Sequence, residues 1–256
     1  MASLRLALSI ENGLARMAFA DADNNAIDLQ FVKEFADAAR VCRADAGVKA
    51  VLLQGRGNVF GLGGDIKEFM QHKARIKAHL LDMTTYFHSA ISHLHNGSAP
   101  VIVAVNGMAA GGAFSLVCAA DLAIAKRSAK FISAYSRSGL SPDGGGTYFL
   151  PRIVGLQKAF DIFATNPTLT ADQARDLGIV ARVVDDADFD SEVEKLAQMV
   201  VNAPPGTMAA LKKLLRLSTT ASLEEQFMAE GEAIANLGSS PATLERLTAF
   251  VEKKGK

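Results

Sequence analysis

The sequence predicts an α/β protein, and two observations carry that prediction. A buried strand followed by a glycine-rich loop and a helix occurs twice in the first half of the chain. From about residue 188 to the C-terminus, apolar residues recur almost purely at helical spacing. We therefore expect a mixed β/α core over residues 1–190 and a helical region over residues 191–256.

The core is predicted to be organised around the stretch VIVAVNGMAAGGAFSLVCAAD, which runs from residue 101 to residue 121. Its β-branched and small apolar start predicts a buried strand. Gly107 and the pair Gly111-Gly112 then turn the chain before an apolar helix. The first N–H groups of a helix have no partner inside it, and the helix dipole favours negative charge there. We expect this point to hold a bound phosphate or an oxyanion formed during a reaction.

A second unit of the same kind begins with residues 48–54, VKAVLLQ, and continues through the loop GRGNVFGLGGD into a helix after Asp65. Two glycine loops that each follow a buried strand could direct two backbone N–H donors at one oxygen. Such a pair of donors is an oxyanion hole.

The other elements follow from hydrophobic periodicity and turn residues. Asn12-Gly13 predicts a hairpin between strands 4–10 and 14–19, and the charged residues 71–78 are expected to be solvated or mobile. The expected helices are 29–44, 66–70, 80–94, 148–154, 156–165, 188–201, 206–217, 222–237 and 241–254, and the further strands are 122–125, 130–132 and 179–184.

Composition excludes several classes of protein. The 27 basic and 27 acidic residues balance to a net charge of zero, so we expect no nucleic-acid partner. Two cysteines, Cys42 and Cys118, argue against a disulfide framework and indicate a reducing compartment. The first ten residues lack the apolar centre of a signal peptide, and no apolar run approaches a membrane span. We expect a cytoplasmic protein without a membrane partner.

Asp143 is the most notable side chain. It follows Pro142 and precedes three glycines within a third glycine-rich stretch, residues 138–147. Aspartate in such a place most often shapes a turn or caps a helix. On a loop that faces a pocket, the same carboxylate can act as a general acid or base.

Other kinds of chemistry find little support. No glycine loop matches a Walker or dinucleotide motif, and neither Ser115 nor Ser141 lies in a nucleophile elbow. His93 and His95 fall on different faces of a helix, and the pattern places no carboxylate or cysteine at ligand spacing, so we predict no metal site. His88 is expected either at the polar edge of its helix or in the site.

Three segments together resemble the crotonase family, the enoyl-CoA hydratases and isomerases. They are FGLGGDI at residues 60–66, NGMAAGGA at 106–113 and GLSPDGGGT at 139–147, with Leu-Pro-Arg following at 150–152. The resemblance covers nearly the whole chain. It implies a spiral of ββα turns, a C-terminal helical region that serves oligomerisation and covers the active site, and assembly as a homotrimer or a dimer of trimers. It also implies an acyl-CoA substrate, with coenzyme A entering only as part of the thioester and no separate cofactor.

Carried onto this sequence, the resemblance assigns the oxyanion-hole amides to Gly64 and Gly112 and the catalytic acid/base to Asp143. Leu62 and its neighbours would contact the adenine end of coenzyme A. The residues expected to bind substrate are Ala26, Leu62, Gly63, Asp65, Ile66, Met108, Gly111, Tyr135 and His88.

The departures from the family pattern affect the predicted reaction. Hydratases of this family use two glutamates, and the matching positions here hold Ser115 and Tyr135. With Asp143 as the one remaining acid, the pattern favours an isomerase that moves a double bond from Δ3 to Δ2, similar to an isomerase associated with phenylacetate degradation. The alternatives are a hydratase with an atypical site, a hydrolase similar to 4-chlorobenzoyl-CoA dehalogenase that uses Asp143 and His88, and a CoA-binding protein without turnover.

Overall fold

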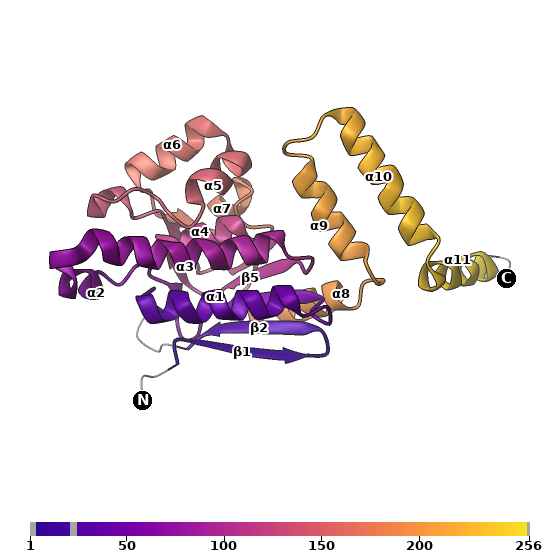
Figure 1. Cartoon of the computed structure of the whole chain (residues 1–256), viewed down its shortest axis with the longest axis horizontal. Coiled ribbons are helices and arrows are strands. Elements are labelled where there is room, and N and C mark those ends of the chain that lie inside the picture. The colour runs from indigo at the N-terminus through magenta and orange to yellow at the C-terminus, as the bar shows by residue number, and fades with distance from the viewer. Residues whose placement is uncertain (1–3, 21–24, 255–256) are drawn as a thin grey trace.

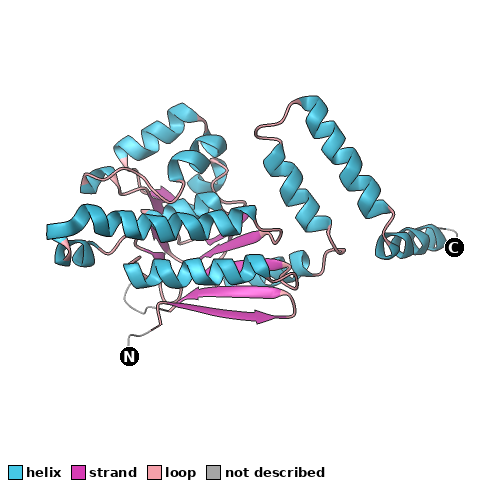
Figure 2. Ribbon diagram, in the orientation of Figure 1, coloured by secondary structure: helices cyan, strands magenta, loops and turns pink. Residues whose placement is uncertain are grey.

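The centre of the molecule is a six-stranded sheet, seen in a computed structural model that describes residues 4–20 and 25–254 (Figures 1 and 2). The strand order is β1-β2-β3-β5-β7-β10. The first two strands form the predicted antiparallel hairpin, and every other neighbouring pair is parallel. The strands are β1 (Leu6–Glu11), β2 (Leu14–Phe19), β3 (Ala50–Gln54), β5 (Val101–Val105), β7 (Leu122–Lys126) and β10 (Arg182–Val184).

A second, four-stranded sheet has the order β4-β6-β8-β9. Its strands are β4 (Val59–Gly61), β6 (Met108–Ala110), β8 (Lys130–Ile132) and β9 (Leu169–Thr170). β4, β6 and β8 directly follow β3, β5 and β7 along the chain, so the ββ unit occurs three times, as expected for a spiral of ββα turns. β4 and β6 fall in the predicted loops, because strands of three residues are too short to show a period.

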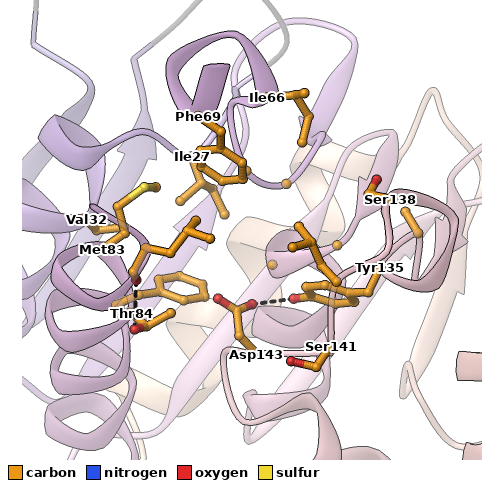
Figure 3. A pocket seen from close by; sticks show the side chains of 18 of the residues that line it. Ile27, Val32, Ile66, Phe69, Met83, Thr84, Tyr135, Ser138, Ser141 and Asp143 are labelled. Atoms are coloured by element: carbon orange, nitrogen blue, oxygen red, sulfur yellow. Dashed lines mark hydrogen bonds between the residues drawn. The ribbon is translucent and has the colours of Figure 1, made fainter. Parts of the chain in front are cut away.

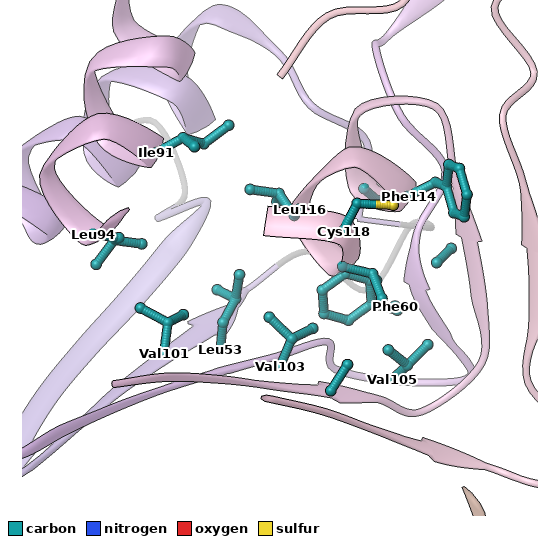
Figure 4. Close-up of a cluster of buried hydrophobic side chains, with 14 of the residues drawn as sticks. Leu53, Phe60, Ile91, Leu94, Val101, Val103, Val105, Phe114, Leu116 and Cys118 are labelled. Carbon is teal, nitrogen blue, oxygen red and sulfur yellow. The ribbon is translucent and has the colours of Figure 1, made fainter. Parts of the chain in front are cut away.

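β5 is buried on both faces, which explains its unbroken apolar sequence. Val101, Val103 and Val105 face the larger apolar cluster beneath α4 (Gly112–Ala119), as Figure 4 shows. Ile102 and Ala104 face a second cluster that contains α8 (Phe189–Val201). Because α8 covers this face of the sheet, the packed core extends beyond the boundary drawn at residue 190.

Two long helices lie side by side on the face of the sheet to which Val101, Val103 and Val105 point (Figure 1). α1 (Leu29–Ala44) begins where the Asp28 side chain accepts the Phe31 N–H at 2.7 Å. It packs on α3 (Ile76–Asn96), where the ring centroids of Phe35 and Phe87 lie 6.2 Å apart.

Residues 71–78 are mostly exposed, as expected, but they form helical turns and not a loop. α2 (Ile66–Gln71), the 3₁₀ turn η1 (Lys73–Arg75) and the start of α3 occupy this segment. The next residue, His79, is buried in the first turns of α3. The remaining elements of the core are η2 (Ser136–Ser138), α5 (Gly146–Val154), α6 (Leu156–Thr165) and α7 (Ala171–Asp176).

The C-terminal helices α9 (Thr207–Leu217), α10 (Leu223–Gly238) and α11 (Pro241–Lys254) extend away from the core (Figure 1). α9 is tied to it by Lys212, which is buried and donates to the carbonyls of Leu94 and Ala99 and to the carboxylate of Asp121. Among the residues that the structure describes, no helix has the length and apolar character needed to cross a membrane.

The buried thiols of Cys42 and Cys118 predict a loss of stability at alkaline pH. Burial raises the pKa of Cys118 from 9.0 to about 12 and that of Cys42 to about 11. Above pH 9 the unfolded chain releases thiol protons that the folded chain keeps, so the free energy of unfolding falls as pH rises through this window. For Cys118 the expected slope is about 1.4 kcal/mol per pH unit. Urea unfolding of wild type and Cys118→Ala under reducing conditions measures it; equal alkaline slopes would contradict the prediction.

Candidate active site

The two glycine loops meet directly. Gly63, at the end of the first loop, has a φ of +81°, and a Cβ placed on it would lie 3.0 Å from the Ala110 carbonyl oxygen and 3.4 Å from the Gly112 nitrogen. Gly111, in the second loop, has a φ of +53°. Both positions therefore require glycine, because both have a positive φ. At Gly63 the close approach of the second loop also leaves no room for a Cβ.

Gly64 and Gly112 both line one cavity. Ile27 is hydrogen-bonded to the first loop on both sides of Gly64: its N–H donates to the Gly63 carbonyl, and its carbonyl accepts the Asp65 N–H. The N–H of Gly64 itself takes part in neither bond. Gly112 is the first residue of α4, where a helix leaves its N–H groups unpaired. Within the described residues, neither amide has an internal acceptor.

The cavity holds about 400 Å³, within the range of small-molecule sites. Figure 3 shows apolar side chains from α1, α2 and α3 on one side and Tyr135, Ser138 and Ser141 on the other. Asp143 is the one carboxylate among the described residues that line it. The lining residues are Ile27, Val32, Leu62, Gly63, Gly64, Ile66, Phe69, Lys77, Leu80, Leu81, Met83, Thr84, Phe87, Gly111, Gly112, Ala134, Tyr135, Ser138, Leu140, Ser141 and Asp143.

Asp143 is held by a short chain of hydroxyl groups. The Tyr135 hydroxyl donates to Asp143 Oδ1 at 2.5 Å and lies 3.1 Å from Ser115 Oγ, which is fully buried (Figure 3). Burial, reinforced by the adjacent Asp143 carboxylate, raises the pKa of Tyr135 far above its usual value. The tyrosine therefore stays protonated and orients one oxygen of Asp143, and the other oxygen does not take part in this contact.

His88 lies behind Asp143 and not in the same cavity. Its Nε2 accepts the Gly144 N–H at 3.1 Å, and it lines a neighbouring cavity together with Pro142 and Asp143. The nitrogen that accepts this N–H must carry a lone pair, which the hydrogen bond occupies. In this arrangement His88 supports the loop that carries Asp143.

Of the other residues predicted to bind substrate, Leu62, Gly63, Ile66, Gly111 and Tyr135 line the cavity. Three residues do not, and each has another contact. The carbonyl of Ala26 accepts a hydrogen bond from Arg5. Asp65 caps α2 by accepting the N–H groups of Lys67 and Glu68. Met108 pairs with Val59 and Lys130 in the second sheet.

One wall of the cavity could not be predicted from the sequence. Leu80, Met83 and Phe87 fall within the expected helix 80–94, and in the structure they line the cavity together with the glycine loops and Asp143. Their spacing carries the signal, but only the position of α3 shows what they face. The structure also brings together Glu68, His72 and His79, a carboxylate and two histidines that were not recognised from the sequence as lying at ligand spacing.

A substitution at Gly144 tests how closely the loop that carries Asp143 packs against Phe87 and Ser115. At a φ of +60°, a Cβ on Gly144 would lie 2.6 Å from the Phe87 ring and 3.0 Å from Ser115 Cβ. Gly144→Ala should lower the free energy of unfolding by the strain of a left-handed alanine plus about 1–3 kcal/mol of overpacking. Gly139→Ala is the control, since it has a similar φ of +70° and no atom within 4 Å. Equal losses of stability in urea unfolding would disprove the packing argument.

The comparisons with known proteins agree with this architecture. A 32% identical relative over 251 residues, 96% of this chain and 91% of its own length, is 4-chlorobenzoyl coenzyme A dehalogenase-2 of an Arthrobacter species. The 1,2-epoxyphenylacetyl-CoA isomerase of Escherichia coli K12 is 29% identical over 231 residues, covering 90% and 88% of the two chains. The crystal structure of an enoyl-CoA hydratase from Polaromonas sp. JS666 superposes with a TM-score of 0.90 at 26% identity and 97% coverage of each chain.

The spiral of ββα units with a cavity between its glycine loops defines a crotonase-fold protein. Residues 9–256 match the family model described as enoyl-CoA hydratase/isomerase. The chain belongs to this family, whose members act on acyl-CoA substrates.

Proposed function

We propose that the protein is an enoyl-CoA isomerase that moves a double bond from Δ3 to Δ2, with Asp143 as acid/base and the amides of Gly64 and Gly112 as the oxyanion hole. One observation carries the proposal. In the described part of the chain, a single carboxylate, that of Asp143, lines an apolar cavity together with Gly64 and Gly112, two glycines whose amides have no internal acceptor.

The chemistry needs only these groups. The Asp143 carboxylate removes a proton from the α-carbon of the 3-enoyl thioester, and the electron pair moves onto the thioester oxygen as an enolate. The two amides stabilise that oxygen, and an oxyanion-hole donor typically contributes about 3–4 kcal/mol. The protonated Asp143 then returns its proton at the γ-carbon while the double bond moves to Δ2, so no water and no redox partner is consumed.

The surroundings of Asp143 support isomerisation over hydration. A second carboxylate to activate water is absent from the described lining, where Tyr135 is held in its protonated form. The Tyr135 hydrogen bond keeps one carboxylate oxygen in place, so the other can serve both proton transfers without a rotation of the side chain.

A hydrolytic dehalogenase is the second candidate, and the relative from Arthrobacter favours it. In that reaction Asp143 would attack the aromatic ring and His88 would activate the water that releases the product. The hydrogen bond from Gly144 to His88 Nε2 counts against the second step, because it occupies the nitrogen that would take the proton.

A panel of thioesters distinguishes these reactions. Wild type and His88→Gln are assayed with 3-enoyl-CoA, 2-enoyl-CoA and 4-chlorobenzoyl-CoA. We expect isomerisation of 3-enoyl-CoA as the main reaction, with kcat in His88→Gln within about tenfold of wild type because His88 acts through the loop only. Dominant hydration or an aryl ester on Asp143 would overturn the proposal. Binding without turnover would indicate a CoA-binding protein.

We also propose that the chain forms a homotrimer or a dimer of trimers. The C-terminal helices leave Leu223, Phe227, Met228, Ile234 and Leu247 more than half exposed, and such a row of large apolar side chains is typical of an interface. Sedimentation velocity tests this, and a monomer at all concentrations would contradict it. Coenzyme A enters this proposal only as part of the substrate.

A further inference from the structure

We infer that Glu68, His72 and His79 form a binding site for a divalent transition-metal ion such as Zn²⁺, beside the rim of the active-site cavity. One ligand atom of each residue lies within 4.8 Å of the ligand atoms of the other two. A set of two imidazoles and one carboxylate suits Zn²⁺ and its neighbours in the first transition row.

The local sequence brings the three side chains together. Glu68 lies on α2, and His72, four residues later, caps the C-terminal end of that helix. Residues four apart on a helix lie on the same face, so the two side chains are neighbours. The short η1 turn then reverses the chain, and His79 in the first turns of α3 returns to the same point.

The independent observation is the state of His79. Its exposure is 2%, and its Nε2 is buried with no hydrogen-bond partner. The nearest carboxylate oxygen, Glu68 Oε2, lies 3.6 Å away, which is too far for a hydrogen bond. Burying an unpaired ring nitrogen costs free energy, and a metal ion placed between the imidazole and the carboxylate would remove that cost.

The distances leave room for an ion. A tetrahedral ion with bonds of about 2.1 Å holds its ligand atoms about 3.4 Å apart, close to the 3.6 Å between His79 and Glu68. His72, whose ring stacks on His79 with centroids 4.2 Å apart, is only partly buried at the end of α2 and can adjust. Glu68 is oriented by the Leu29 N–H at 3.1 Å, an outer contact of the kind that positions metal ligands.

Such an ion would join α2 to α3. Phe69 packs on the His79 ring with centroids 6.3 Å apart and lines the cavity together with Leu80, the residue after His79. Three protein ligands would leave a fourth position for water. This inference does not depend on which reaction the cavity carries out.

The test uses the full chain, stripped of metal and titrated with Co²⁺ and Zn²⁺ at slightly alkaline pH. We expect one equivalent per chain by calorimetry, with the visible absorption of Co²⁺ bound to imidazole and carboxylate. His72→Gln and Glu68→Gln should each weaken binding at least about tenfold. His93→Gln, on the same helix α3 but hydrogen-bonded to Arg43, is the matched control and should bind as wild type does.

Circular dichroism and thermal unfolding confirm that each variant is folded. His79→Gln is a third variant, but His79 is buried, so this substitution can unfold the protein. In that case the result for His72→Gln decides, because His72 is partly exposed. Equal affinity in wild type and His72→Gln, or only weak binding of several ions per chain, would overturn the assignment.

Discussion

Replacing Asp143 with asparagine should reduce kcat for the isomerisation of 3-enoyl-CoA by about 10²–10⁴-fold, the usual contribution of a positioned acid/base. The asparagine keeps the size of the side chain and still accepts the Tyr135 hydroxyl hydrogen bond, so the cavity should keep its shape. The amide cannot take a proton from the α-carbon, however. Because the apolar walls and the two loop amides remain, KM should change little.

Asp82→Asn is the matched control for this substitution. Asp82 lies on α3, the helix that forms one wall of the cavity, but its side chain is exposed and outside the cavity lining. Its kcat should equal that of wild type. An Asp143→Asn enzyme that keeps activity within a few fold would remove Asp143 from the chemistry and with it the proposed isomerase.

Replacing Lys212 with methionine should lower the free energy of unfolding by about 2–3 kcal/mol. The Lys212 ammonium makes 2.7–2.9 Å hydrogen bonds to two carbonyls and to Asp121, and methionine fills a similar volume without satisfying any of them. Removing one partner of a fully buried ion pair costs about 3–5 kcal/mol. The loss is smaller here because a quarter of the Asp121 side chain is exposed.

Lys213→Met is the control, since Lys213 is the next residue on α9 and is exposed. Urea unfolding near neutral pH measures both variants. Desolvation lowers the pKa of Lys212 to about 8, partly offset by Asp121, so the side chain is still mostly charged under these conditions. Equal midpoints for the two variants would mean that this contact does not anchor α9.

Most helices and the central strands could be predicted from the sequence, because long apolar runs and helical stripes leave a clear period. Val101–Val105 and its loop are the best example. β4, β6 and β9 could not be predicted, since these strands exist because neighbouring turns of the spiral pair with one another. The first turn of α3 could not be predicted either, because its local sequence is charged and exposed and lacks an apolar stripe.

The candidate site shows the same division. The glycines at 63 and 111 could be predicted, since left-handed backbone at a tight turn requires them. The contact partners of Asp65, Met108 and His88 could not, because a capping bond, a strand register and a hydrogen bond to Gly144 depend on how the chain folds around them.

By itself, the sequence determined that this is an α/β protein with two glycine loops after buried strands and one notable acid, since backbone conformation and burial are written in local residue types. Only the tertiary structure decided that those loops touch, that Tyr135 donates a hydrogen bond to Asp143, and that the ligand atoms of two histidines and a glutamate lie within 4.8 Å of one another. Those facts rest on distances between segments that are separate in the chain, and packing alone sets such distances.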